Sequence, residues 1–129
     1  MTDFDLEIKK EFLEEALVNL VEVEDCFTKF ETTADTKPLF SKMFFMAHNL
    51  KGGSLSVGFK DVAELSNKLE NLVLKLQSNE ISFSSEVVSA IHRSNGRLVE
   101  MISHLQSDYS VTFDNSDFLV DLQSILKSA

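Results

Sequence analysis

The sequence predicts an all-α protein, an up-and-down antiparallel four-helix bundle with an additional short C-terminal helix. The chain of 129 residues contains one proline and four glycines, so few residues interrupt a helix. Apolar side chains return every three or four residues, which is the period of an amphipathic helix. Short connections between long helices place neighbouring helices antiparallel. A chain of this length fits one domain, which we predict to span residues 1–129.

The first helix is predicted over residues 6–31 and the second over residues 37–57. The stretch between them is polar and turn-like, and Pro38 suits the first turn of a helix, where its missing N–H would have no partner. Gly58 can adopt the left-handed conformation that ends a helix. The first helix carries a continuous apolar stripe, formed by Ile8, Phe12, Ala16, Leu20, Val23, Phe27 and Phe30.

Three further helices are predicted over residues 60–78, 84–107 and 116–127. Ser84 is a suitable N-cap for the fourth helix, since its hydroxyl can accept a bond from a free backbone N–H. Asn95 falls on the apolar stripe of that helix and is expected to be a hydrogen-bonded amide in the core. The third helix has the most regular apolar pattern, formed by Val62, Leu65, Leu69, Leu72 and Leu76.

The composition excludes several classes of partner. With a formal net charge of −9, the domain repels phosphate backbones and anionic lipids, so neither nucleic acid nor membrane insertion is expected. Cys26 is the single cysteine and cannot form an intramolecular disulfide, which fits a reducing compartment. The acidic residues 1–5 do not resemble a signal peptide, and the apolar runs are short. We therefore expect a cytoplasmic domain.

The three histidines are the first candidates for chemistry, because imidazole changes its charge near neutral pH. His92 and His104 lie twelve residues apart without the spacing of a helical metal site, and no function is predicted for them. His48 instead lies mid-helix beside Gly52 and Gly53. Each interior glycine costs a helix about 1 kcal/mol relative to alanine, so this pair indicates that side-chain bulk is excluded here.

Helical geometry assigns the two glycines different tasks. Gly53 falls on the core face and is expected to serve packing, whereas Gly52 lies one turn beyond His48 and leaves its imidazole accessible. Lys51 is also one turn away and places a cation near the ring. An accessible neutral imidazole is a nucleophile, and a neighbouring cation stabilises an incoming phosphoryl group. The expected chemistry is phosphoryl transfer. The face of His48 also carries Ser41, Phe44, Phe45 and Leu55.

A reliable nucleophile needs its other ring nitrogen bonded to a fixed acceptor. In an antiparallel hairpin that turns at Gly58, the position opposite His48 is near residue 68. Glu70 and Asn67 share the polar flank there, so Glu70 is the preferred acceptor and Asn67 a second hydrogen-bonding partner. The alternative for Glu70 is a solvated surface carboxylate.

The run from His48 to Ser54, HNLKGGS, is followed by Gly58-Phe59. It resembles the signature of histidine phosphotransfer domains, His-x-x-Lys-Gly-Gly with a Gly-Phe pair soon after. Residues 63–72, AELSNKLENL, look like the next helix of the amino-terminal phosphotransfer domain in CheA-type chemotaxis histidine kinases. The likeness covers nearly the whole chain, including its acidic first helix.

The resemblance implies a role for each matching residue. His48 would be the phosphorylated residue, Lys51 its electrostatic neighbour, and Glu70 the acceptor that orients the imidazole. Asn67 departs from the family, because chemotaxis kinases often carry a second histidine at this position. An amide can form hydrogen bonds but cannot titrate.

In that family a separate ATP-binding domain phosphorylates the histidine, and a receiver-domain aspartate of a CheY-like response regulator takes the phosphoryl group. This sequence has no glycine-rich nucleotide loop and no acidic metal cluster, so no cofactor is expected in it. ATP and magnesium are expected on the kinase and receiver partners. Phe44, Phe45, Gly52 and Leu55 around His48 are the candidate docking patch, with burial in the core as the alternative for the phenylalanines.

We therefore predict a phosphoryl carrier of two-component signalling, in chemotaxis. One alternative is a phosphotransfer module of a non-chemotaxis phosphorelay or hybrid kinase, and another is a non-catalytic helical adaptor that binds a protein partner. The sequence leaves open whether the domain is free-standing or belongs to a longer histidine kinase.

Overall fold

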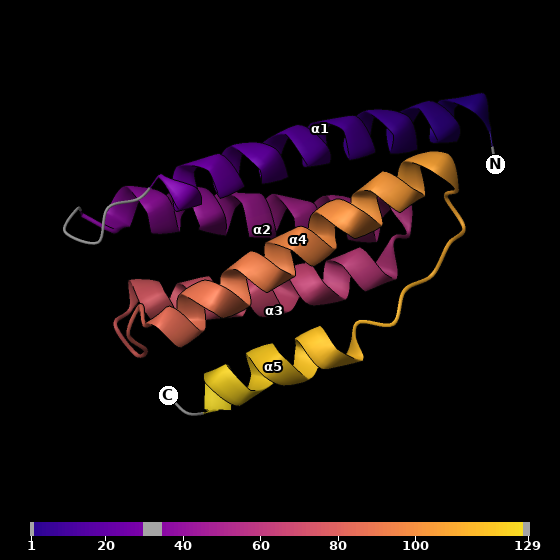
Figure 1. The fold of residues 1–129 in the computed structure, drawn as a ribbon. Helices are drawn as coiled ribbons and strands as arrows, with labels where there is room; N and C mark the ends of the chain where they lie inside the picture. Colours follow the sequence, from indigo (N-terminus) through magenta and orange to yellow (C-terminus); the bar gives the residue numbers. More distant parts are fainter. Residues whose placement is uncertain (1, 30–34, 128–129) are drawn as a thin grey trace.

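The computed structural model describes residues 2–29 and 35–127, which form five helices and no strand (Figure 1). The predicted all-α class is confirmed. Helices α1 to α4 form the bundle, and the shorter α5 packs against α3 and α4. The helices are α1 (Asp3–Thr28), α2 (Lys37–Val57), α3 (Lys60–Gln77), α4 (Ser85–Ser107) and α5 (Ser116–Lys127).

The first helix begins earlier than its apolar pattern predicts, at Asp3 instead of residue 6. The Thr2 hydroxyl accepts a bond from the Asp5 amide, and the Asp5 carboxylate accepts one from the Thr2 amide, both at 3.1 Å. This capping box satisfies backbone donors and so extends the helix into a polar segment. The bonds from the Thr2 amide and hydroxyl lower the pKa of the Asp5 carboxyl. The helix ends at Thr28, and residues 30 and 31 lie outside the described residues.

The other helix ends follow local signals. Pro38 lies in the first turn of α2, and Gly58 ends this helix with a left-handed φ of 87°. The Ser84 hydroxyl accepts a bond from the Val87 amide at 3.3 Å and caps α4, which begins one residue later than predicted. The third helix ends at Gln77, one residue earlier than predicted. Pro38 and Gly58 thus set the two ends of α2, and the turn at Gly58 sets where α3 begins beside it.

The core lies between the four long helices and extends under α5. Within the described residues, no helix combines the length and the apolar character needed to cross a bilayer. The large side chains that are completely buried come from all five helices and are Leu13, Leu20, Met43, Leu65, Leu69, Leu72, Ile91, Leu98, Met101, Ile102, Leu105 and Leu122.

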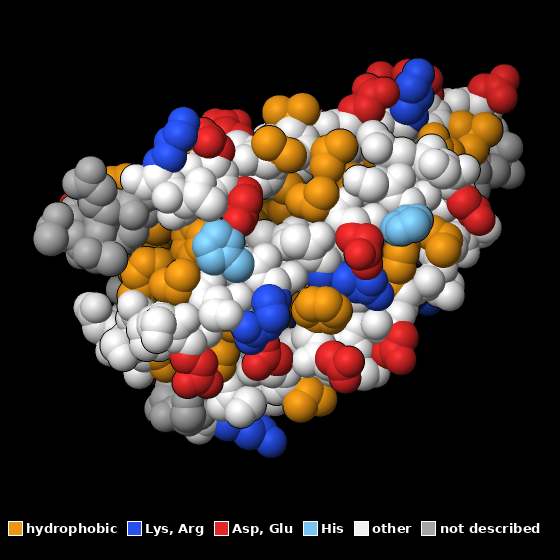
Figure 2. Space-filling model, in the orientation of Figure 1, with side chains coloured by type: hydrophobic (Ala, Val, Ile, Leu, Met, Phe, Trp, Pro, Cys, Tyr) orange, Lys and Arg blue, Asp and Glu red, His pale blue; other side chains and the backbone are white. Residues whose placement is uncertain are grey.

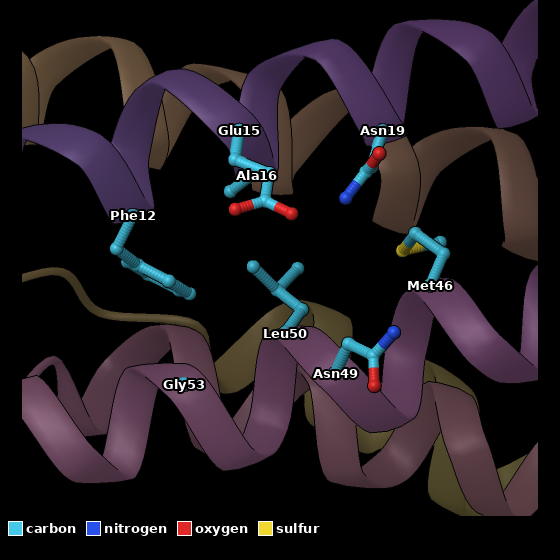
Figure 3. Close-up of a pocket in the computed structure, with 8 residues that line it drawn as sticks. All are labelled: Phe12, Glu15, Ala16, Asn19, Met46, Asn49, Leu50 and Gly53. Carbon is cyan, nitrogen blue, oxygen red and sulfur yellow. The ribbon is translucent and has the colours of Figure 1, made fainter.

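Gly53 has the packing role that its face predicts. A Cβ atom built on it would overlap the ring of Phe12, so this ring can lie against α2 because position 53 carries no side chain. Figure 3 shows Phe12 extending from α1 toward α2 at this point, beside a pocket whose polar lining includes Glu15, Asn19 and Asn49. This pocket lies between α1 and α2, and His48 is not among its lining residues.

Candidate functional site

His48 and Glu70 meet across the α2–α3 hairpin. The imidazole Nδ1 lies 3.0 Å from a carboxylate oxygen of Glu70, while 54% of the histidine side chain remains exposed. A carboxylate can only accept, so Nδ1 carries the proton and donates it. In the neutral ring this leaves the lone pair on Nε2, which makes Nε2 the nucleophilic atom.

Glu70 is buried, with 9% of its side chain exposed, so the alternative of a solvated surface carboxylate is wrong. Its second oxygen accepts a bond from Lys51 Nζ at 3.0 Å. A carboxylate in such a place is destabilising unless it is paired and hydrogen-bonded, and here both oxygens have partners. Lys51 thus supports the charge of Glu70 and places a cation one helical turn from His48.

Phe44 contacts the imidazole of His48 through its ring. Its ring stacks on that of His48 with a centroid distance of 5.5 Å and an angle of 14° between the planes. The ring of Phe45 contacts Phe44 edge-on at 5.9 Å. A carboxylate therefore fixes one nitrogen of the imidazole, and an aromatic ring stacks on the imidazole plane.

The predicted docking residues lie around His48 on an open surface. Phe45 and Leu55 are 61% and 60% exposed, so neither belongs to the core, whereas Phe44 is half-buried. Gly52 is exposed, and a Cβ atom there would have no neighbour within 4 Å. Gly52 thus leaves an open position one helical turn from His48, and the exposed side chains of Phe45 and Leu55 lie on the same helix.

Asn67 is not brought into this group. It is half-buried on α3, and within the described residues no hydrogen bond joins it to His48. Nδ1 has one proton to donate, and Glu70 already accepts it. The expectation that Asn67 is a second partner of His48 is therefore not met in this structure.

Sequence reasoning missed a second histidine with a carboxylate partner. His92 on α4 contacts Glu24 on α1, with 2.5 Å between Nδ1 and a carboxylate oxygen. The two residues are 68 positions apart, so the spacing of neighbouring residues could not predict the pair. The available signal was Asn95, a polar residue on the apolar stripe, which also binds Glu24.

Comparison with known proteins agrees with these features. A family model described as Hpt domain matches residues 7–108. The chain is 30% identical over 115 residues to the chemotaxis protein CheA of Listeria monocytogenes and to that of Listeria innocua, an alignment that covers 89% of this chain and 19% of each relative. It is 24% identical over 114 residues to the chemotaxis protein CheA of Bacillus subtilis, covering 88% of this chain and 16% of the relative. No solved structure matches the chain.

Proposed function

Since the chain belongs to the Hpt domain family, and so is a phosphotransfer carrier domain of two-component signalling, we propose that Nε2 of His48 is its phosphoryl acceptor. One observation carries the proposal: Nδ1 of an exposed imidazole is bonded to a buried carboxylate at 3.0 Å. This bond leaves the other ring nitrogen as the nucleophile. Lys51 places a positive charge near the ring, which stabilises an arriving phosphoryl group.

The proposed transfer balances without a cofactor in this chain. The Nε2 lone pair forms a bond to the γ-phosphorus of ATP on a kinase domain, the bond between this phosphorus and its bridging oxygen breaks, and ADP leaves. The Nδ1 proton stays in its bond to Glu70, which stabilises the resulting cationic ring. A receiver aspartate then attacks phosphorus, and the N–P bond breaks to regenerate neutral His48. ATP and magnesium are assigned to the two partners.

The proposed partners are the ATP-binding domain of a histidine kinase and a CheY-like receiver domain. They would dock in turn on the docking patch, which consists of Phe44, Phe45, Gly52 and Leu55 around His48. Exposed apolar side chains beside a reactive group are suited to transient protein contacts. The names of the relatives favour chemotaxis over another phosphorelay. The chain spans only 19% of the length of the first of these relatives. That it belongs to a longer histidine kinase is therefore also a proposal.

Labelling tests the carrier function directly. The chain is incubated with the ATP-binding domain of a CheA relative, magnesium and γ-labelled ATP. We expect a label that is lost in acid and kept in alkali, and that moves to a CheY-like receiver domain when this is added. An acid-stable label, or none, would contradict the proposal. A label that moves only to receivers from outside chemotaxis would keep the carrier function and reject the chemotactic assignment.

Gly52→Ala should separate access to His48 from helix stability. Alanine at an open helical position should raise the free energy of unfolding by about 1 kcal/mol. The added methyl group should also obstruct the approach to Nε2 and slow labelling by about tenfold or more. Gly96 on α4 is an equally open glycine, and Gly96→Ala should give the same stabilisation with unchanged labelling of His48. Urea unfolding and initial labelling rates measure both effects. Equal labelling rates in the two variants would remove Gly52 from the docking patch.

A further inference from the structure

His92 lies in a different part of the molecule from His48. His48 belongs to the α2–α3 pair, whereas His92 on α4 faces α1. In Figure 2 the molecule is seen with α4 in front, and histidine side chains are exposed on this face. The His92 side chain is 39% exposed, and its Nδ1 is bonded to Glu24. As in His48, the carboxylate accepts the Nδ1 proton and leaves the lone pair on Nε2.

The carboxylate of Glu24 is itself fixed through both oxygens. One contacts His92, and the other accepts a bond from Asn95 Nδ2 at 3.1 Å. Asn95 is 1% exposed, so its amide lies in the core as expected, but only its nitrogen has a hydrogen-bond partner and its buried Oδ1 has none. Asn95 thus binds the second oxygen of Glu24, as Lys51 binds the second oxygen of Glu70. Because Asn95 is neutral, the charge of Glu24 remains available to a cationic imidazole.

The two sites also share their spacing along the helix. His48, Lys51 and Gly52 stand at positions i, i+3 and i+4, and so do His92, Asn95 and Gly96. Gly96 is exposed, and a Cβ atom there would have no neighbour within 4 Å. The open position one turn beyond the imidazole is therefore present in both sites.

An aromatic ring restrains His92 as another restrains His48. The ring of Phe27 lies edge-on to His92 with a centroid distance of 4.3 Å and an angle of 67°. Phe27 is buried, so its position is set by the core. A fixed carboxylate, an aromatic neighbour and an open approach are the features that prepare an imidazole for nucleophilic attack.

We propose that His92 is a second phosphoryl-accepting residue, which takes a phosphoryl group on Nε2 from small phosphorus–nitrogen donors such as phosphoramidate. The Nε2 lone pair forms the new N–P bond as the P–N bond of the donor breaks and ammonia leaves. The Nδ1 proton remains in the bond to Glu24, whose charge stabilises the cationic phosphoimidazole. The inference uses the chemistry of the proposed function but concerns another imidazole on other helices.

His104 provides the internal control. It lies on the same helix and is exposed, more so than His92, and its ring lies beside that of Phe113 at a centroid distance of 6.2 Å. Within the described residues no carboxylate contacts its ring nitrogens. Modification governed by exposure alone would favour His104, whereas modification governed by orientation favours His92.

The chain has three histidines, so double variants leave one imidazole to be observed. His48→Gln/His104→Gln retains His92, and His48→Gln/His92→Gln retains His104. Each is treated with phosphoramidate and followed by ³¹P NMR, which distinguishes phosphorus on Nδ1 from phosphorus on Nε2. We expect His92 to react about tenfold faster than His104, and only on Nε2. Adding Glu24→Gln to both double variants should remove this advantage at His92 and leave the rate at His104 unchanged.

Each outcome decides the inference. A His92 rate equal to or below that of His104, phosphorus on Nδ1 of His92, or a His92 rate unaffected by Glu24→Gln would overturn it. The comparison of the His92 and His104 rates and the position of phosphorus on His92 are measured with Glu24 unchanged. Both results therefore remain valid even if the Glu24→Gln variants fold poorly. Kinase-dependent labelling of His48 is read in the wild-type chain, so failure of the proposed function and failure of this inference are separate results.

Discussion

Replacing His48 by glutamine is expected to reduce kinase-dependent labelling to background, a loss on the order of 10³-fold or more. Glutamine has no nucleophilic ring nitrogen, but its amide can still donate a bond to Glu70, whose other oxygen keeps Lys51. Because 54% of the His48 side chain is exposed, the free energy of unfolding should change by only about 0.5 kcal/mol. Labelling with γ-labelled ATP and urea unfolding measure the two quantities.

His104→Gln is the matched control, since it makes the same substitution at an exposed histidine on α4, whereas His48 lies on α2. It should be labelled at the wild-type rate. Equal labelling of wild type and His48→Gln would show that His48 is not the phosphorylated residue, and that another residue carries the label.

Glu70→Gln should give the second-largest effect, slowing the phosphorylation of His48 by about 10²-fold while the helical fold remains. The carboxylate accepts from His48 with one oxygen and from Lys51 with the other. An amide can accept through only one of its two ends. If its NH₂ faces Nδ1, the imidazole proton moves to Nε2 and the nucleophilic lone pair is lost. If its NH₂ faces Lys51, two donors oppose each other in a buried place.

The comparison variant is Glu64→Gln, which removes an exposed carboxylate from the same helix. Initial rates of labelling at saturating kinase, together with circular dichroism, distinguish loss of orientation from loss of fold. A rate for Glu70→Gln that matches Glu64→Gln would show that Glu70 does not orient His48.

The sequence allowed most of the helix ends to be predicted, because each depends on nearby residues. Pro38, Gly58 and Ser84 act within a few positions, and the helices begin or end next to them. The predicted start of α1 was wrong because the helix begins at a capping box between Thr2 and Asp5, which precedes the first apolar residues of the stripe. The spacing of apolar residues shows which face of a helix is buried. It cannot show a first turn that precedes the apolar stripe.

The two histidines illustrate the same limit for sites. Glu70 was predicted opposite His48 because consecutive helices joined by a short turn have a register that can be counted from Gly58. Glu24 was missed because α1 and α4 are not consecutive, and their register follows from packing of the whole bundle. The counting also placed Asn67 near His48, but it could not show that Glu70 alone takes the single proton of Nδ1.

The hairpin that joins His48 to Glu70 also has a consequence for folding. These residues are 22 positions apart, so their contact closes a small loop, whereas the contact of His92 with Glu24 closes one of 68 positions. Smaller loops lose less chain entropy on closure, and local contacts form sooner. The α2–α3 hairpin is therefore expected to assemble His48, Lys51 and Glu70 early, before α1 and α4 have met. In pulsed hydrogen exchange, amides of this hairpin should gain protection ahead of those of α1.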